Sequence, residues 1–194
     1  MKALLAQVDS LSEEFLSRHS EYARLLFEVL IIAEDRRARW HVGVDPVSIA
    51  RALLVATRTG RMRGVSTIEQ QLVRTLRPRR HSAARSKPME LVLATVIGLR
   101  FSKGVIWAAY LNAAYYGADW ETFDEVVEAV AANPDQLSPD EACTVIAYLK
   151  YPKPEDDWPQ WTAKHSNRSS RLMGLYEARI RDRPRAPLEQ PSLA

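Results

Sequence analysis

Residues 31–46 read IIAEDRRARWHVGVDP, and in this stretch an apolar helix ends in a group of charges. The carboxylates of Glu34 and Asp35 directly follow the apolar run, and the guanidinium groups of Arg36 and Arg37 come next. One interpretation is a salt-bridged helix end that reaches water. The other is a catalytic carboxylate, partly removed from water, beside a site for an anion. The surrounding sequence has to decide between them.

Helical periodicity extends outward from this stretch over most of the chain. Apolar residues recur at helical spacing over 11–33, and Asp45 followed by Pro46 is a typical start for a helix over 47–59. Further helices are predicted over 66–76, 89–101, 103–116, 121–132, 138–150 and 169–181. No alternating strand pattern stands out, so the predicted fold class is mainly α.

Local signals place several of these helix ends. The sequences STIE at 66–69 and SPDE at 138–141 match the capping box, in which the first side chain and the fourth bond each other's backbone. Pro88 is expected to open the next helix and to put Glu90 in its first turn, where the helix dipole favours a carboxylate. Gly117 is expected to close the helix over 103–116.

The composition is that of a folded protein with a core. The chain has 194 residues, of which 46% are apolar and 26% are charged. Its one cysteine, Cys143, excludes an internal disulfide, and no spacing of Cys and His predicts a zinc site. We find no signal-peptide pattern, and no apolar run reaches the roughly 20 residues of a membrane-spanning helix. The chain is therefore expected to carry no membrane anchor of its own.

Basic residues concentrate between Arg58 and Lys87, where nine cations accompany a single acid, Glu69, although the net charge of the chain is only +3. This concentration of one sign predicts an anionic partner, such as a phosphate. A nucleic acid is excluded from the predicted partners, because the stretch contains no aromatic residue on which a base could stack.

Two segments within this basic region place polar side chains where the helix pattern does not require them. They are GVSTIEQQL at 64–72 and SKPMEL at 86–91. Taken singly, each has an ordinary structural explanation, as a helix cap or as a carboxylate near a helix start. Their order along the chain, behind the charged stretch at 31–46, makes a functional interpretation stronger.

Together these segments resemble glycosyltransferase family 51, the peptidoglycan transglycosylase domain of class A penicillin-binding proteins and of monofunctional transglycosylases. The motifs that carry the resemblance are EDRR-x-x-x-H-x-GVDP, G-x-STI-x-QQL, K-x-x-E and SK-x-x-I-x-x-x-YLN-x-x-YYG, in this order. The resemblance extends from about Leu30 to Pro154. It implies a lysozyme-like orthogonal helical domain, which we expect over residues 1–155, followed by a connection and helix over 156–182 and a disordered tail over 183–194.

The resemblance also implies an activity and two catalytic residues. The family polymerises lipid II by inverting glycosyl transfer, with release of the lipid pyrophosphate. The general base of the family corresponds to Glu34. The second glutamate of the family assists the departing pyrophosphate, directly or through a divalent cation (Mg or Mn), and corresponds to Glu90. The ligands of such a metal are not assigned. The apolar run before Glu34 would partly desolvate it, which suits a general base.

The same resemblance, with the chemistry of the side chains, predicts the residues that bind substrate. Amides and hydroxyl groups suit sugar hydroxyl and acetamido groups, whereas guanidinium and ammonium groups suit a pyrophosphate. The expected substrate-binding residues are Asp35, Arg36, Ser66, Thr67, Gln70, Gln71, Arg74 and Lys87. His41 is expected to act as scaffolding that sets the position of Glu34.

Several positions depart from the family pattern. Ala38 replaces a phenylalanine, which removes an aromatic ring from the expected site wall, and Ser86 replaces the first basic residue of the third motif. Ala108 replaces a glutamate of the fourth motif, and the stretch from Ala118 onward does not match a fifth motif. These departures leave a second hypothesis, a catalytically impaired relative that binds the peptidoglycan precursor or a cell-wall partner.

The expected partners follow from this interpretation. They are lipid II, the nascent glycan and, by peripheral contact through residues around 61–87, a membrane surface. The family implies a location in the periplasm or at the outer face of the cytoplasmic membrane. A glycan hydrolase with the same broad fold also uses paired carboxylates, but it has no need of cations for a phosphate leaving group.

Overall fold

The computed structural model describes residues 1–60, 66–77, 83–156 and 158–182. Over these ranges the chain forms eight α-helices and no strand, with one isolated parallel bridge between Gly117 and Lys153. The helices are α1 (Lys2–Glu34), α2 (Pro46–Thr59), α3 (Ile68–Leu76), α4 (Ala83–Arg100), α5 (Lys103–Ala113), α6 (Phe123–Val130), α7 (Pro139–Tyr148) and α8 (Pro159–Arg181). The mainly α prediction is confirmed.

Parts of the sequence predictions lie outside this description. They are the tail over 183–194, the basic segments 61–65 and 78–82, and the side chains of Arg85 and Ser86. The division at residue 155 stays a prediction.

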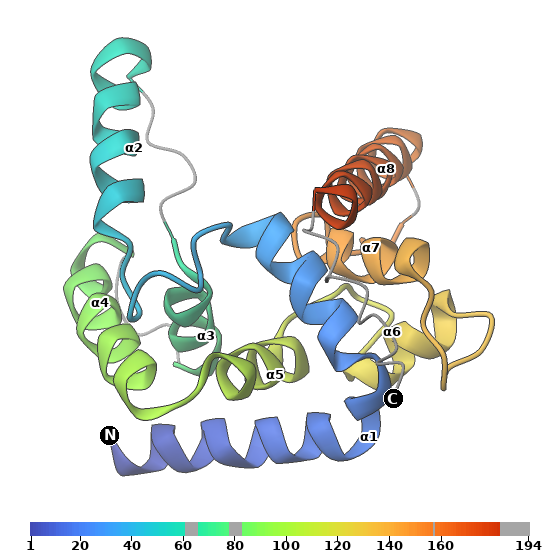
Figure 1. Ribbon diagram of the computed structural model, residues 1–194, viewed down its shortest axis with the longest axis horizontal. Coiled ribbons are helices and arrows are strands. Elements are labelled where there is room, and N and C mark those ends of the chain that lie inside the picture. Colours follow the sequence, from blue (N-terminus) through green and yellow to red (C-terminus); the bar gives the residue numbers. More distant parts are fainter. Residues whose placement is uncertain (61–65, 78–82, 157, 183–194) are drawn as a thin grey trace, which may run out of the picture.

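Helix α1 forms the frame on which the other helices pack (Figure 1). Its path changes direction at His19, whose backbone angles (φ −123°, ψ 17°) are not helical. The first segment runs beside α5, and the second rises through the middle of the molecule toward α7 and α8. The helix begins at Lys2, earlier than the predicted residue 11, because Val8 is fully buried in the core and holds the first turns in place.

The ends of α3 and α4 differ from the sequence prediction. Helix α3 is capped by Thr67, whose side chain accepts a hydrogen bond from the Gln70 backbone N–H at 3.3 Å, and not by the predicted capping box of 66–69. The Glu69 side chain instead forms an ion pair with Lys103 of α5. Helix α4 begins at Ala83 and contains Pro88, so Glu90 lies beyond its first turn.

Among the later helices, the start of α7 agrees with the sequence prediction, whereas the end of α5 and the start of α8 differ from it. The capping box at 138–141 is present at the start of α7. Helix α5 ends at Ala113, before Gly117. The Lys153 N–H donates to the Tyr116 carbonyl and the Ala118 N–H donates to the Lys153 carbonyl, so Gly117 lies so close to Lys153 that a Cβ atom there would be 2.6 Å from the Lys153 backbone nitrogen. Helix α8 begins at Pro159, ten residues before the predicted start, because proline suits the first helical turn.

The loop between α1 and α2 is fixed by Gly43. Its backbone has a positive φ of 79°, and a Cβ atom there would lie 2.2 Å from the Ala94 carbonyl oxygen of α4. Only glycine allows so close an approach in this conformation. The Gly43 carbonyl accepts hydrogen bonds from the Thr67 hydroxyl at 2.7 Å and from the Gln70 amide at 3.4 Å. The loop, α3 and α4 are therefore held together beside the end of α1.

Candidate active site

A cleft of about 300 Å³ opens at the C-terminal end of α1. It lies between the loop that follows α1, the start of α2, the N-terminus of α3 and one face of α8. The residues that line it are 32–37, Asp45, Ser48, Arg51, Ser66, Thr67, Arg168, Arg171 and Leu175. Five of these are arginines, more than the acidic groups present, so the cleft suits an anionic ligand.

Glu34 is the last residue of α1, and its side chain, 16% exposed, lies on the wall of the cleft. One carboxylate oxygen accepts a hydrogen bond from Arg168 Nη2 at 3.3 Å, and the other accepts one from Gln71 Nε2 at 3.3 Å. The side-chain carbonyl oxygen of Gln71 accepts a hydrogen bond from the Tyr110 hydroxyl at 2.8 Å. Burial, and next the nearby charge of Glu34, raise the pKa of Tyr110, which keeps its hydroxyl protonated as a donor.

Glu90 lies in a different environment beside α3. Its buried carboxylate accepts from Lys87 Nζ at 2.5 Å and from Arg74 at 3.1 and 3.3 Å. Burial alone would raise the pKa of Glu90, but the hydrogen bonds and charges of Arg74 and Lys87 together hold it below its usual value. Lys87 also donates to the Gln70 side chain at 2.9 Å, and Arg74 donates to the Ser66 hydroxyl at 3.1 Å.

Helix α3 joins these two environments. Gln71, which contacts Glu34, and Arg74, which contacts Glu90, are three residues apart and therefore neighbours on one helix face. The two carboxylates thus lie about one helical turn apart along α3. Glu34 lines the cleft, whereas Glu90 is connected to the cleft wall through Arg74 and Ser66.

The predicted substrate-binding residues divide into two groups. The residues that line the cleft are Asp35, Arg36, Ser66 and Thr67, and those that do not line it are Gln70, Gln71, Arg74 and Lys87. Both ends of the buried Gln70 side chain bond within the chain, to Gly43 and to Lys87. The direct contacts of the second group are therefore mainly with the two carboxylates and with each other.

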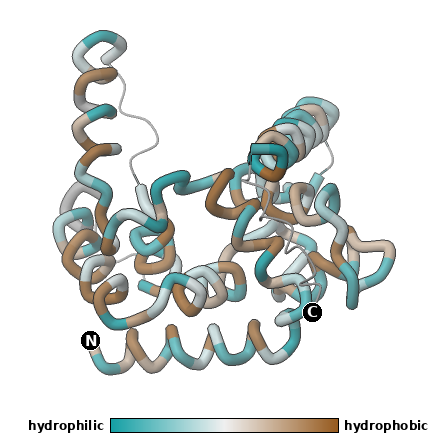
Figure 2. The backbone as a smooth tube through the Cα atoms, in the orientation of Figure 1, coloured by the Kyte–Doolittle hydropathy of each residue, from teal (hydrophilic) through white to brown (hydrophobic). Residues whose placement is uncertain are grey.

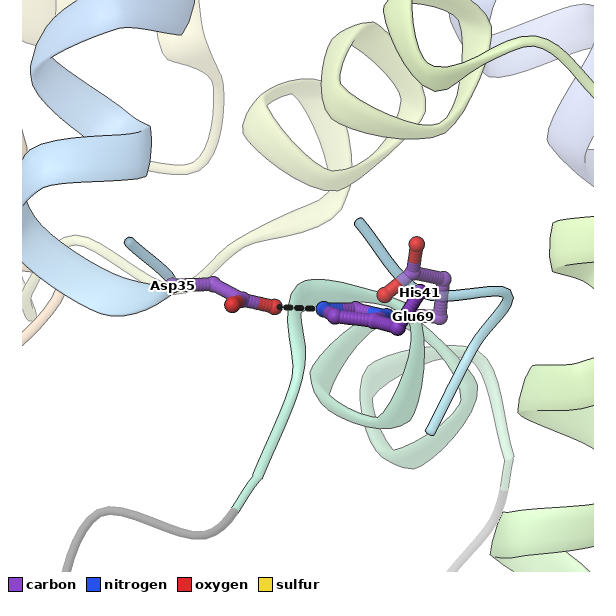
Figure 3. A group of neighbouring side chains, drawn as sticks. All are labelled: Asp35, His41 and Glu69. Carbon is purple, nitrogen blue, oxygen red and sulfur yellow. Dashed lines mark hydrogen bonds and ion pairs between the residues drawn. The ribbon is translucent and has the colours of Figure 1, made fainter. Parts of the chain in front are cut away.

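Asp35 and His41 form a buried pair in the loop between α1 and α2. The Asp35 carboxylate and His41 Nε2 are 2.9 Å apart, and both side chains are less than a tenth exposed (Figure 3). The pair closes the turn that follows α1, which supports the prediction that His41 is scaffolding for Glu34.

Glu69 lies close enough to this pair for one donor atom of each residue to fall within 4.8 Å of the others (Figure 3). Three such donors are a possible metal-binding group. Asp35 already bonds the imidazole, and the Lys103 ammonium pairs with one Glu69 oxygen. The buried His41 Nδ1 and the second Glu69 oxygen have no hydrogen-bond partner among the described residues.

The divalent cation that the family resemblance implies does not fit the surroundings of Glu90. Two cationic side chains already contact that carboxylate, and the one group of three possible ligands found among the described residues, Asp35, His41 and Glu69, does not include it. The charge that a metal would supply to a pyrophosphate is available from Arg74 and Lys87. We therefore derive no catalytic step from a metal.

Two departures from the family pattern lie in the core. Ala38 is fully buried and is not among the residues that line the cleft. Ala108 is fully buried in α5. Both substitutions therefore change packing around the site, because neither side chain faces the cleft.

Sequence reasoning missed the residues that come from distant helices. Arg168 and Arg171 reach the cleft from α8, and Tyr110 supports Gln71 from α5. The predicted last helix began at residue 169, one position after Arg168. The motif YLN-x-x-YYG contains Tyr110, and its place in this motif was the available signal.

A profile described as "Transglycosylase" matches residues 2–175, which includes most of α8. Among curated proteins, the chain is 32% identical over 179 residues to penicillin-binding protein 1B of Haemophilus influenzae, covering 88% of this chain and 23% of that protein. It is 35% identical over 129 residues to penicillin-binding protein 1A of Aquifex aeolicus, covering 66% and 18%. It is 35% identical over 99 residues to penicillin-binding protein 1B of Escherichia coli, covering 50% and 12%. The chain spans less than a quarter of the length of each of these relatives.

Proposed function

The chain belongs to the transglycosylase family, and on that basis we propose that it is a peptidoglycan glycosyltransferase that polymerises lipid II. The observation that carries the proposal is the placement of Glu34. Its carboxylate lies on the wall of an arginine-lined cleft. About one helical turn further along α3, the carboxylate of Glu90 contacts the cationic side chains of Arg74 and Lys87. A glycosyl transfer with a pyrophosphate leaving group requires these two kinds of surroundings side by side.

Glu34 is the general base in this proposal. Its carboxylate takes the proton from the 4-hydroxyl of the acceptor sugar, while that oxygen attacks the anomeric carbon of the donor from the face opposite the pyrophosphate. The bond between the anomeric carbon and the pyrophosphate oxygen breaks, and the pyrophosphate leaves with the electron pair. The configuration at the anomeric carbon is thereby inverted. Each Glu34 oxygen has one donor and keeps lone-pair capacity for the incoming proton.

Arg74 and Lys87 supply the positive charge that the departing pyrophosphate needs. Glu90 holds both side chains within hydrogen-bonding distance of one carboxylate, so their charges are arranged before the reaction begins. Charge that is arranged beforehand stabilises a transition state without reorganisation during the step. Side chains of both residues are partly exposed, at 46% and 39%, and can therefore meet a ligand.

A membrane surface is the proposed source of the substrate. None of the helices over the described ranges is both long enough and apolar enough to span a bilayer. Helices α2 and α4 lie at the same outer edge of the molecule, and apolar residues recur along both (Figures 1 and 2). The exposed apolar side chains on these two helices are Val47, Leu54, Val55, Met89, Val92 and Leu99. Such a surface suits peripheral contact with lipid.

Incubation of the purified chain with lipid II in detergent or vesicles tests the proposal. The expected products are glycan strands that a muramidase degrades, together with free lipid pyrophosphate in proportion to the bonds formed. The second candidate, a relative that binds the precursor without elongating it, is favoured by the engagement of Gln70 and Glu90 within the chain. Binding of lipid II without product would select this second candidate.

A further inference from the structure

Arg168, on the last helix of the described chain, contacts the proposed general base directly. Its Nη2 atom donates to the Glu34 carboxylate at 3.3 Å and to the Ala33 backbone carbonyl at 2.8 Å. Residues 34 and 168 are 134 positions apart, and α8 packs on both α1 and α7. The side chain is mostly buried, at 21% exposed, and lines the cleft.

The contact with Ala33 fixes where the guanidinium group lies. Carbonyl groups in the last turn of a helix have no partner within the helix, and a cation there also interacts favourably with the helix dipole. Arg168 satisfies such a carbonyl at the end of α1. It is thereby anchored on the backbone next to Glu34, and its position does not depend on the ion pair alone.

The packing of α8 against α7 also supports the contact between Arg168 and Glu34. Leu172, one turn beyond Arg168, is fully buried, and the adjacent Ser169 is 3.0 Å from the Thr144 hydroxyl of α7. His165, one turn before, contacts the Thr144 carbonyl at 3.2 Å. Three neighbouring side chains thus hold this part of α8 against α7 and leave Arg168 directed at α1.

The second Glu34 oxygen is held independently. Because the Tyr110 hydroxyl donates to the Gln71 carbonyl oxygen, the Gln71 amide nitrogen must face Glu34. The carboxylate therefore has one donor on each oxygen, from α8 on one side and α3 on the other. Two separate donors fix the plane of the carboxylate as well as its position.

We infer that Arg168 is a positioning residue for the proposed reaction, which orients the Glu34 carboxylate toward the cleft. The inference rests on the proposed function, because it assigns Arg168 a part in the same glycosyl transfer. The guanidinium contacts one Glu34 oxygen through a single hydrogen bond at 3.3 Å, so the carboxylate is oriented and still keeps lone pairs for a substrate proton.

Removal of the guanidinium has a consequence that a merely structural role does not share. Arg168→Met takes away the donor to one Glu34 oxygen and leaves only the Gln71 amide on the other, so the carboxylate is no longer held in one orientation. A misplaced base slows the chemical step more than it weakens substrate binding. The loss should therefore appear in kcat and leave KM for lipid II close to the wild-type value.

The test is the steady-state kinetics of lipid II polymerisation for the wild type, Arg168→Met and Arg168→Lys. Arg168→Met is expected to lower kcat about 10- to 100-fold and to leave KM within about twofold of the wild-type value. Arg168→Lys, which keeps a charged donor, is expected to restore part of kcat. Arg181→Met is the matched control, because it is exposed and lies 13 residues further along the same helix, about 20 Å away.

Circular dichroism and thermal melting establish that each variant is folded before the rates are compared. A loss in Arg168→Met that appears in KM with kcat unchanged would overturn the inference, as would an Arg168→Lys variant no faster than Arg168→Met. Equal rates in Arg168→Met and Arg181→Met would overturn it as well. A wild-type chain that makes no glycan from lipid II contradicts the proposed function itself, which separates the two failures.

Discussion

Glu34 of α1 and Glu90 of α4 are both glutamates that contact α3, at positions about one helical turn apart, and their surroundings differ. Each Glu34 oxygen has a single donor at 3.3 Å, one of them a neutral amide. Glu90 is in contact with two cations, the closest at 2.5 Å, and its pKa is lowered against the effect of burial. Two carboxylates in such different environments can serve two different roles. In our account, Glu34 exchanges a proton and Glu90 holds positive charge in place.

The same conservative substitution at both positions tests this difference most severely. Glu34→Asp keeps the charge but withdraws the carboxylate by one methylene group, and a base must reach its proton to act. We expect a loss of about 100-fold in polymerisation rate. Glu90→Asp also keeps the charge, and Arg74 and Lys87 can follow it, so a loss of about tenfold or less is expected. Steady-state rates on lipid II measure both; equal losses would contradict the division of roles.

Glu90→Gln separates the contribution of Glu90 to stability from its contribution to rate. A carboxyl group whose pKa is lower in the folded than in the unfolded protein stabilises the fold above its ordinary pKa of 4.5, and this stability is lost as the pH falls through the folded value. The wild type should therefore lose more stability than Glu90→Gln between about pH 5 and pH 3. Urea unfolding at a series of pH values measures it. The rate should fall about tenfold at neutral pH, because Arg74 and Lys87 lose their shared partner.

Tyr110→Phe gives the smallest expected effect. It removes the hydroxyl that orients the Gln71 amide, so the donor to one Glu34 oxygen is no longer fixed. We expect a loss of a few-fold in rate and about 0.5–1.5 kcal/mol in unfolding free energy, the usual contribution of one hydrogen bond. Glu90 accepts its hydrogen bonds from Arg74 and Lys87 and not from Tyr110, so the acid stability attributed to Glu90 should be unchanged. A changed acid transition would show that the two environments are not separate.

The sequence predicted the parts of this site that depend on local patterns. The end of an apolar helix at Glu34, the Asp45 cap and the capping box at 138–141 all rest on residues close together in the chain. Local rules failed where a distant partner competed. Glu69 matched a capping box, but Lys103 from α5 takes its carboxylate, and Pro88 suggested a helix start that lies five residues earlier.

The remaining features of the site depend on contacts across the fold. The Arg168–Glu34 contact joins residues 134 positions apart, and the Tyr110–Gln71 bond joins residues 39 apart. Residues so far apart are not related by helical periodicity, so the sequence pattern does not predict these contacts. The buried position of Ala38 likewise depends on how the loop folds back onto the core.

The most direct measurement of the central claim is the rate of lipid II polymerisation by Glu34→Gln together with its affinity for lipid II. The substituted amide keeps the shape and the hydrogen-bonding capacity of the side chain but cannot take up the acceptor proton. Our account predicts a loss of about 10³- to 10⁴-fold in rate, with lipid II affinity and thermal stability close to those of the wild type. A variant that retains polymerisation within tenfold of the wild type would contradict the assignment of Glu34 as the general base.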